Sequence, residues 1–327
     1  DRVSTVYLPD SKISMLPPLL SDNLCSLVVG EQRYTVAMDL LLTPDDKIDS
    51  VKFTNCIIKV KRNYVYEDKL LLKNPHYLSI LKKAKSMCKD GMYMDEITDS
   101  HDVVAFFMMM MNHRVGVILN DANCGIFRGV SLLNCNDVAR QNNVPEPIKQ
   151  IVSLWRNAKG NYETAKTHKG HDLIGKGLEA YSQVTSPIRR VVDLVNIIEL
   201  QRIMGLVPEI SGMCKFVEKW TDRIEYINQI MKKITKVQRE CLLLERCLST
   251  DTKKKYEGYV IEISDANVNS SQPSNMYRHI VHLPELGLTT HVDTVCEMKL
   301  YSLNLFTLHI FVDETTLNKK VRLQYFE

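Results

Sequence analysis

The stretch YSQVTSPIRRVVDLVN, residues 181–196, places two arginines directly after a Thr-Ser-Pro sequence and before an aspartate and an apolar run. Serine and threonine are favoured helix caps and proline is favoured at the first helical position, so the pattern predicts a helix that starts at Pro187. Arg189 and Arg190 would then lie in the first turn, where the helix dipole disfavours cations. Free backbone N–H groups and two guanidiniums at one turn favour a bound anion such as phosphate.

The alternative to a phosphate site is an internal ion pair. Asp193 lies three residues after Arg190 and four after Arg189, so all three share one face of the predicted helix. We expect one of the two arginines to pair with Asp193, which leaves the second guanidinium without a carboxylate. On these residues alone, a structural ion pair and a phosphate site both remain open.

The composition is that of an ordinary globular protein. The 327 residues are 45% hydrophobic and 25% charged, with a net charge of +3 that permits a polyanionic partner without requiring one. Nine cysteines without a Cys-x-x-Cys pair favour reduced thiols over zinc or disulfides. The longest apolar run, Val103–Met111, is too short for a bilayer, and the chain does not begin with a signal peptide. We therefore expect no membrane partner and a cytoplasmic location.

The pattern along the first 248 residues predicts mixed helix and strand. Val3–Leu8 is typical of a strand, and two alternating segments near residues 34–42 and 49–60 predict a hairpin. Asp45-Asp46 lies between them, and we interpret this pair as turn chemistry rather than a metal site. The apolar spacing predicts helices at 66–74, 76–91 with a stop at Gly91, 101–119 capped by Ser100, two short helices within 136–158 broken at Pro145 and Pro147, 187–205, and one long helix at 211–247; residues 161–177 are expected to form a loop.

The last part of the chain has a different character. A polar linker, STDTKKK, precedes about five short strands between Tyr256 and the C-terminus. Short alternating strands at this spacing predict a small barrel of the OB type. We therefore predict two domains, at residues 1–248 and 249–327.

Five motifs resemble the RNase II family in the family's own order. Besides residues 181–196, they are STVYLPDSKISMLPPLLSDNLCSL (4–27), FTNCIIKVKRNYVYEDKL (53–70), FMMMMNHRVG (107–116) and GIFRG (125–129). The resemblance covers residues 1 to about 245, and the barrel occupies the place of the family's C-terminal RNA-binding barrel. It implies an α+β fold: an RNB-type catalytic domain, with a mixed sheet packed by helices, followed by an OB-fold. The form of residues 181–196 looks closest to a divergent branch found in large DNA viruses.

The resemblance implies an activity and a set of site residues. The family hydrolyses single-stranded RNA from the 3′ end to nucleoside monophosphates and uses Mg²⁺ held by aspartates. Arg189 matches the arginine at the scissile phosphate, Arg190 a backbone-phosphate contact, and Ser186 belongs to the same RNA-binding turn. Tyr7 matches an aromatic that stacks near the 3′-terminal base, and Tyr66 a tyrosine near the catalytic centre. Without the resemblance, both tyrosines are more simply half-buried sheet aromatics.

The chain departs from the family in its acidic residues. The aspartate cluster should precede VYLPD, and Asp1 cannot replace it, so we expect the Mg²⁺ ligands upstream of residue 1 and assign no metal ligand here. Ala105 and Phe106 stand where the family has an acidic pair before the Met-x-x-x-Asn motif. Three interpretations remain: an exoribonuclease whose N-terminal part lies outside this chain, a catalytically degenerate protein that acts as an RNA-binding or scaffold subunit, and a purely structural subunit.

Overall fold

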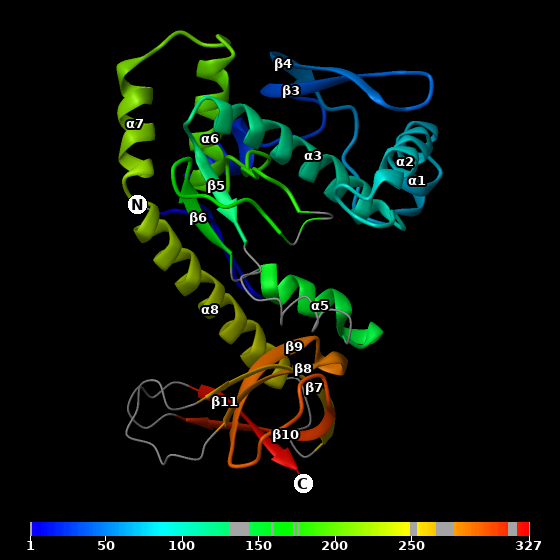
Figure 1. Cartoon of the computed structure of the whole chain (residues 1–327), viewed down its shortest axis with the longest axis vertical. Helices are drawn as coiled ribbons and strands as arrows, with labels where there is room; N and C mark the ends of the chain where they lie inside the picture. The colour runs from blue at the N-terminus through cyan, green and yellow to red at the C-terminus, as the bar shows by residue number, and fades with distance from the viewer. Residues whose placement is uncertain are drawn as a thin grey trace. The chain divides into compact units, whose positions relative to one another are not determined.

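The computed structural model of the chain divides into two compact units (Figure 1). The first comprises Asp1–Val6, Lys12–Leu132 and Lys159–Lys232, and the second Tyr7–Ser11, Leu133–Ala158 and Lys233–Glu327. The structure describes residues 2–130, 144–157, 160–172, 174, 177–248, 254–265, 277–312 and 319–326. The domain boundary predicted between residues 248 and 249 stays a prediction.

The first unit contains the predicted hairpin. Strands β3 (Gln32–Leu42) and β4 (Ile48–Lys59) pair in antiparallel register. In the turn between them, the Asp45 carboxylate lies 3.3 Å from the Lys47 ammonium, and Asp46 has a positive φ of 60°. Both aspartates therefore serve the turn, as predicted. The short elements before the hairpin are β1 (Val6–Tyr7), β2 (Lys12–Ile13) and the π-helical turn η1 (Leu19–Leu24).

Helices α1 (Lys69–Leu72) and α2 (Pro75–Met87) follow the hairpin. The side chain of Asn74 accepts hydrogen bonds from the first two free N–H groups of α2, which fixes where this helix begins. A 3₁₀ turn, η2 (Cys88–Asp90), ends at Gly91, whose φ of 62° is the left-handed conformation that glycine favours. The stop predicted at Gly91 is confirmed.

Helix α3 (Ser100–Asp121) is the central apolar helix of the first unit. Its cap is Asp99, which forms a capping box with Asp102, so the predicted cap at Ser100 is wrong by one residue. The Ser100 hydroxyl instead donates to Glu67 at 2.7 Å, which ties α3 to the segment before α1. A partner distant in sequence thus decides the role of Ser100.

Hydrophobic packing places α3 inside the first unit. Among the described residues, α3 has the length and the apolar composition that a bilayer-spanning helix needs, with a mean hydropathy of 1.4. We predicted no such stretch because the uninterrupted apolar run is short; the helix is longer than that run. Met110 is 1% exposed and packs in one cluster with Phe106, so the predicted core role of its methionines is confirmed there.

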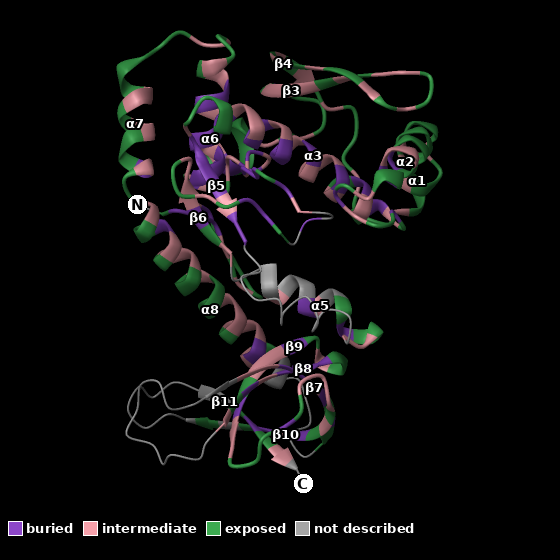
Figure 2. Cartoon of the chain, viewed as in Figure 1, coloured by how far each residue is buried: buried purple, intermediate pink, exposed green. Residues whose placement is uncertain are grey.

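The remaining elements of the first unit surround the opening motif. Strands β5 (Ile126–Gly129) and β6 (Asn161–Thr164) pair in antiparallel register, although residues 161–177 were expected to form only a loop. The strand forms because Tyr162 is buried, at 4% exposure, opposite Arg128. Helix α6 (Val191–Ile203) follows, and Figure 2 shows buried residues gathered along β5 and α6.

The long helix predicted at 211–247 is two helices. They are α7 (Ser211–Thr221) and α8 (Ile224–Leu248). At the break, the Arg223 N–H bonds to the carbonyl of Trp220, three residues back, in the tighter geometry of a helix end. Thr221 and Asp222 at this point are weaker helix formers than their neighbours. The continuous apolar spacing concealed this break.

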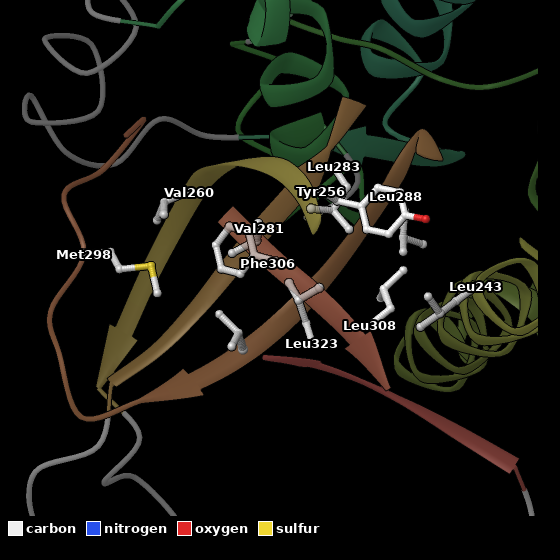
Figure 3. Close-up of a cluster of buried hydrophobic side chains, with 11 residues drawn as sticks. Leu243, Tyr256, Val260, Val281, Leu283, Leu288, Met298, Phe306, Leu308 and Leu323 are labelled. Carbon is white, nitrogen blue, oxygen red and sulfur yellow. The ribbon is translucent and has the colours of Figure 1, made fainter. Parts of the chain in front are cut away.

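The second unit is built on a five-stranded antiparallel sheet. Its strands lie in the order β11-β10-β7-β8-β9, and the sheet is nearly closed, which fits the predicted OB-fold. Large apolar side chains such as Tyr256 and Phe306 fill its interior, and Leu243 of α8 joins them (Figure 3). The strands are β7 (Lys255–Asp265), β8 (Tyr277–Leu283), β9 (Leu288–Thr294), β10 (Leu303–Val312) and β11 (Lys319–Phe326).

Helix α5 (Glu146–Asn157) packs against this barrel. The indole N–H of Trp155 donates to Glu262 of β7 at 2.8 Å, and the Arg239 guanidinium lies 4.5 Å from the Trp155 ring centroid. We expected two short helices within 136–158, broken at Pro145 and Pro147. Residues 136–143 lie outside the described residues, and Pro147 sits in the first turn of α5, where proline does not interrupt a helix.

Candidate functional site

The two arginines of residues 181–196 lie before the helix and not in it. Helix α6 begins at Val191, and Arg190 is its N-cap residue with an extended backbone of φ −140° and ψ 128°. The N–H groups of Arg189 and Arg190 both donate to the carbonyl of Ser186 at 3.1 Å, which closes a turn around Pro187. The predicted helix start at Pro187 is therefore wrong.

The N-terminal segment forces this extended backbone. Ser4 and Arg190 form an antiparallel bridge, in which the Thr5 N–H donates to the Arg189 carbonyl and the Val191 N–H donates to the Val3 carbonyl, both at 2.9 Å. A residue held in a β bridge cannot adopt helical dihedrals, so α6 starts one residue later. Within the strand predicted at Val3–Leu8, Ser4 forms this isolated bridge and Val6–Tyr7 forms β1.

Asp193 forms an ion pair with Arg190 and not with Arg189 among the described residues. The Arg190 Nε lies 2.7 Å from Oδ2 of Asp193, and an Arg190 terminal nitrogen donates to Oδ1 at 2.9 Å. Oδ1 also accepts the backbone N–H of Ser186 at 2.8 Å, so one fully buried carboxylate holds both ends of the turn. Burial opposes the charged form of Arg190, but the adjacent carboxylate outweighs it and raises the pKa of this guanidinium. The expected ion pair is confirmed.

A second arginine, Arg128 of β5, belongs to the same buried region. Its guanidinium lies 5.1 Å from the ring centroid of Tyr162, and burial together with the charge of Arg190 lowers its pKa. The Tyr162 hydroxyl donates to the side chain of Gln183 at 2.7 Å, and burial raises the pKa of Tyr162. We did not predict either residue as part of the site. The GIFRG motif was the available signal for Arg128, whereas Tyr162 lay in a segment expected to be a loop.

Two buried asparagines hold the chain that leads into the turn. Asn112 of α3 donates to the Tyr181 hydroxyl and accepts the Val184 N–H, each at 3.0 Å. Asn196 of α6 donates to the carbonyl of Gln183 at 3.0 Å. Because both amides are at most 1% exposed, their hydrogen bonds fix residues 181–184 against α3 and α6. This explains why the Met-x-x-x-Asn helix accompanies residues 181–196.

Arg189 has a different environment from Arg190. Its side chain is exposed and has no ion-pair or hydrogen-bond partner among the residues that the structure describes. It borders a cleft of about 660 Å³ together with Thr185 and Ser186. The other lining residues are mostly apolar and come from the segment after η1, the hairpin, α3, the turn before α6, and α6: Cys25, Leu27, Tyr34, Thr35, Val36, Asn55, Cys56, Met111, Val184, Pro187, Ile188, Ile197 and Gln201.

The remaining predicted residues are dispersed. Ser186 lines the cleft and is buried, at 8% exposure. Tyr66 lies outside any strand, is 46% exposed and stacks on His101 with ring centroids 3.7 Å apart. Tyr7 lies in β1, is also 46% exposed and belongs to the second compact unit. Neither tyrosine lines the cleft, and their roles in RNA binding stay predictions.

A divalent metal does not fit the residues of this region. The described part of the chain contains no group of three or more histidine, cysteine, aspartate or glutamate side chains that could hold a metal ion. Asp193, the carboxylate nearest the turn, is occupied by Arg190 and Ser186. The exposed guanidinium of Arg189 at the cleft suits an anion instead.

Comparisons with known proteins connect this geometry to a family. The RNB domain model matches residues 1–76. Exoribonuclease 2 of Edwardsiella piscicida is 25% identical over 273 residues, which cover 63% of this chain and 42% of that protein. Ribonuclease R of Helicobacter pylori is 21% identical over 340 residues, which cover 81% of this chain and 50% of that protein. The chain thus spans about half the length of these relatives.

Solved structures share the fold. Mycoplasma genitalium RNase R in complex with ribose methylated single-stranded RNA superposes with a TM-score of 0.68 at 16% identity, covering 98% of this chain and 63% of that one. Yeast Ssd1, described as a pseudonuclease, superposes with a TM-score of 0.64 at 17% identity, covering 89% of this chain and 42% of that one. Neither comparison tests the predicted closeness to the branch in large DNA viruses. The RNB match over residues 1–76 and the sequence relatives support a relationship to the RNase II family, and the solved structures share the fold.

Proposed function

We propose that the protein is a 3′-to-5′ exoribonuclease that hydrolyses single-stranded RNA to nucleoside monophosphates. The observation that carries the proposal is the contrast between two adjacent arginines. Arg190 is paired with buried Asp193, whereas Arg189 is exposed beside a cleft with no partner among the described residues. An unpaired guanidinium on a rigid turn stabilises the charge that develops on a phosphate during hydrolysis, because no side chain has to be reorganised.

Within this proposal the residues of the turn have separate roles. Arg189 contacts the scissile phosphate. Arg190 holds the turn through Asp193, and a guanidinium has five N–H donors, so those not directed at Asp193 are the ones that contact the RNA backbone. Ser186 accepts the N–H groups of both arginines through its carbonyl, which keeps the turn closed while RNA binds. Tyr66 and Tyr7 supply exposed rings, and stacking on an aromatic ring accepts any base.

The proposal includes a metal and a location. RNase II family enzymes are generally dependent on a divalent metal. We propose Mg²⁺ as this metal; within the described residues no group of three or more histidine, cysteine, aspartate or glutamate side chains could hold it. Single-stranded RNA is the proposed partner, and the cytoplasm the proposed location.

The second candidate function is RNA binding or scaffolding without catalysis. Two observations favour it: the fold is shared with Ssd1, described as a pseudonuclease, and Ala105 and Phe106 replace an acidic pair of the family motif. This candidate predicts RNA binding that weakens with salt and no metal-dependent turnover.

The two candidates are separated by assaying the full-length protein on a uniformly labelled single-stranded RNA with Mg²⁺. For the enzyme we expect release of nucleoside monophosphates, slowed about 10²-fold to 10³-fold by Arg189→Ala, the range for loss of one transition-state donor. RNA affinity, measured in EDTA, should change little in this variant. Lys215→Ala removes one exposed charge from α7 and is the matched control. RNA binding without turnover by the wild-type protein would select the second candidate.

A further inference from the structure

A basic and aromatic segment follows the hairpin at residues 59–66, with the sequence KVKRNYVY. We name it the arm. It connects the end of β4 to the residues before α1, inside the first compact unit. Lys59, Lys61 and Arg62 are exposed, and among the described residues none of the three has a carboxylate partner. The arm therefore presents three cations to solvent within four residues.

Hydrogen bonds hold the arm in place. The Val60 carbonyl accepts the Gly30 N–H at 2.9 Å, and the Asn63 side chain donates to the Leu27 carbonyl at 3.0 Å. Further along, the Tyr64 hydroxyl accepts a hydrogen bond from Asn74 at 2.8 Å. Because these contacts fix the backbone before any ligand arrives, binding here costs little ordering of the chain.

Two aromatic rings, Tyr64 and Tyr66, follow the three cations of the arm. The Arg62 guanidinium lies 5.1 Å from the centroid of the Tyr64 ring, so the cation and the ring form one composite surface. The next aromatic, Tyr66, stacks on His101. A guanidinium beside an aromatic ring offers a phosphate contact and a stacking face together, which is the combination found in proteins that bind single strands.

The acidic residues next to the arm form no ion pair with its cations among the described residues. Glu67 accepts hydrogen bonds from the backbone and the hydroxyl of Ser100, at 2.8 and 2.7 Å, and these bonds lower the pKa of its carboxyl group. Asp68 accepts the N–H of Leu70 as the cap of α1. Both carboxylates are thus engaged by other groups, while the cations of the arm have none among the described residues.

We propose that the arm is an additional binding site for single-stranded RNA, in which Lys59, Lys61 and Arg62 contact successive phosphates and Tyr64 stacks on a base. The proposal rests on the proposed function and extends it from the Arg189 cleft to the arm, whose last residue is Tyr66. RNA is favoured over an acidic polypeptide because a polypeptide would use the cations alone, whereas the arm also fixes an aromatic ring beside them.

The test measures binding of the full-length protein to a fluorescent single-stranded RNA in EDTA at several salt concentrations. The arm variant is Lys59→Ala/Lys61→Ala/Arg62→Ala. The control is Lys82→Ala/Lys85→Ala/Lys89→Ala, which removes the same net charge from exposed positions on α2 and η2. We expect the arm variant to weaken binding about tenfold or more and to reduce the salt slope by about 2, since each phosphate contact on a single strand contributes about 0.7. The control should change binding less than twofold.

Substitutions of Tyr64 separate stacking from charge. Tyr64→Ala should weaken binding about tenfold, the effect of losing one stacked base, whereas Tyr64→Phe keeps the ring and should bind nearly as well as the wild type. The arm is not an RNA-binding site if the arm variant and the control lose affinity equally, or if neither changes while the wild type binds RNA. In both cases the proposed function stands. No RNA binding by the wild type overturns both. Competition by polyglutamate as strong as by polyuridine would overturn RNA as the ligand.

Discussion

The carboxylate of Asp193 lies 2.7 Å from Nε of Arg190 and is fully buried within the first turn of α6. This one contact gives two adjacent arginines different environments, since the partly buried Arg190 is held against Asp193 while Arg189 reaches solvent at the cleft. A buried ion pair adds little net stability compared with apolar residues, but a lone buried charge is costly. The pair therefore matters mainly because it fixes the turn that presents Arg189.

Replacement of Asp193 by asparagine should destabilise the protein. The variant keeps an oxygen that accepts the Ser186 N–H but leaves the partly buried Arg190 guanidinium without a counter-charge, which costs up to about 3–5 kcal/mol. Urea unfolding of the wild type and the variant measures the change. The double variant Asp193→Asn/Arg190→Leu also removes the unpaired guanidinium and should recover much of the lost free energy of unfolding. A double variant less stable than Asp193→Asn would show that the unpaired guanidinium is not the cause of the destabilisation.

Truncation of Asn112 should loosen the residues before the turn. Asn112→Ala leaves the buried Val184 N–H and the Tyr181 hydroxyl without their partner, and a buried unsatisfied group costs about 1–3 kcal/mol. Hydrogen exchange of the Val184 amide reports this directly and should accelerate. Asn112→Asp keeps the acceptor for Val184 and loses only the donor to Tyr181, so its Val184 amide should stay better protected than in the alanine variant. Equal protection in both variants would argue against the assigned roles.

Two glycine-to-alanine substitutions should have opposite signs. A Cβ at Gly116 of α3 would lie 3.0 Å from the backbone carbonyl of Ala180, so the chain before the turn must shift, and overpacking of this kind costs about 1–3 kcal/mol. A Cβ at Gly212 of α7 meets nothing within 4 Å. Gly212→Ala should therefore be neutral or stabilising by up to about 1 kcal/mol, from helix propensity alone. Thermal unfolding of both variants measures the difference, and a stabilising Gly116→Ala would refute the close approach.

The free energy of unfolding should decrease as the pH is lowered from neutrality to about pH 4, because of His171. Burial, reinforced by the charge of Arg128, lowers the pKa of His171 from 6.5 to about 4. Between these values the unfolded chain takes up a proton that the folded protein excludes, so the contribution is present above pH 6.5 and is lost as the pH falls, by roughly 3 kcal/mol in all. Urea unfolding from pH 7 to pH 4.5 should show a shallower pH dependence for His171→Leu. His76→Leu, at an exposed position of α2, is the control and should keep the wild-type slope.

Local sequence patterns predicted most of the elements. Alternation identified β3 and β4, and apolar spacing with cap residues identified α2 and its end at Gly91, because those features depend on neighbours within one turn or one hairpin. The barrel strands were visible for the same reason. The break between α7 and α8 was missed, since an apolar face that continues on both sides of Asp222 has the same spacing as one uninterrupted helix.

Contacts between distant residues account for the errors near the site. The helix expected from Pro187 begins at Val191, because a bridge to Ser4 holds Arg190 extended, and no local pattern shows a partner 186 residues away. Tyr162 was missed because its strand exists only through its pairing with β5. Asp99 and not Ser100 caps α3, because the Ser100 hydroxyl hydrogen-bonds to Glu67.

The sequence by itself determined that an arginine pair, one aspartate and a turn occur together, and that one arginine would pair while the other would not. It also determined the OB-type barrel, whose strands are encoded by alternation. Only the tertiary structure decided which arginine pairs with Asp193 and which one faces the cleft. Pairing of residues 3–5 with 189–191 sets the direction of the backbone, so Asp193 reaches Arg190 and the side chain of Arg189 is left at the cleft. Side-chain types are local information, whereas the direction of each side chain depends on pairing across the whole first unit.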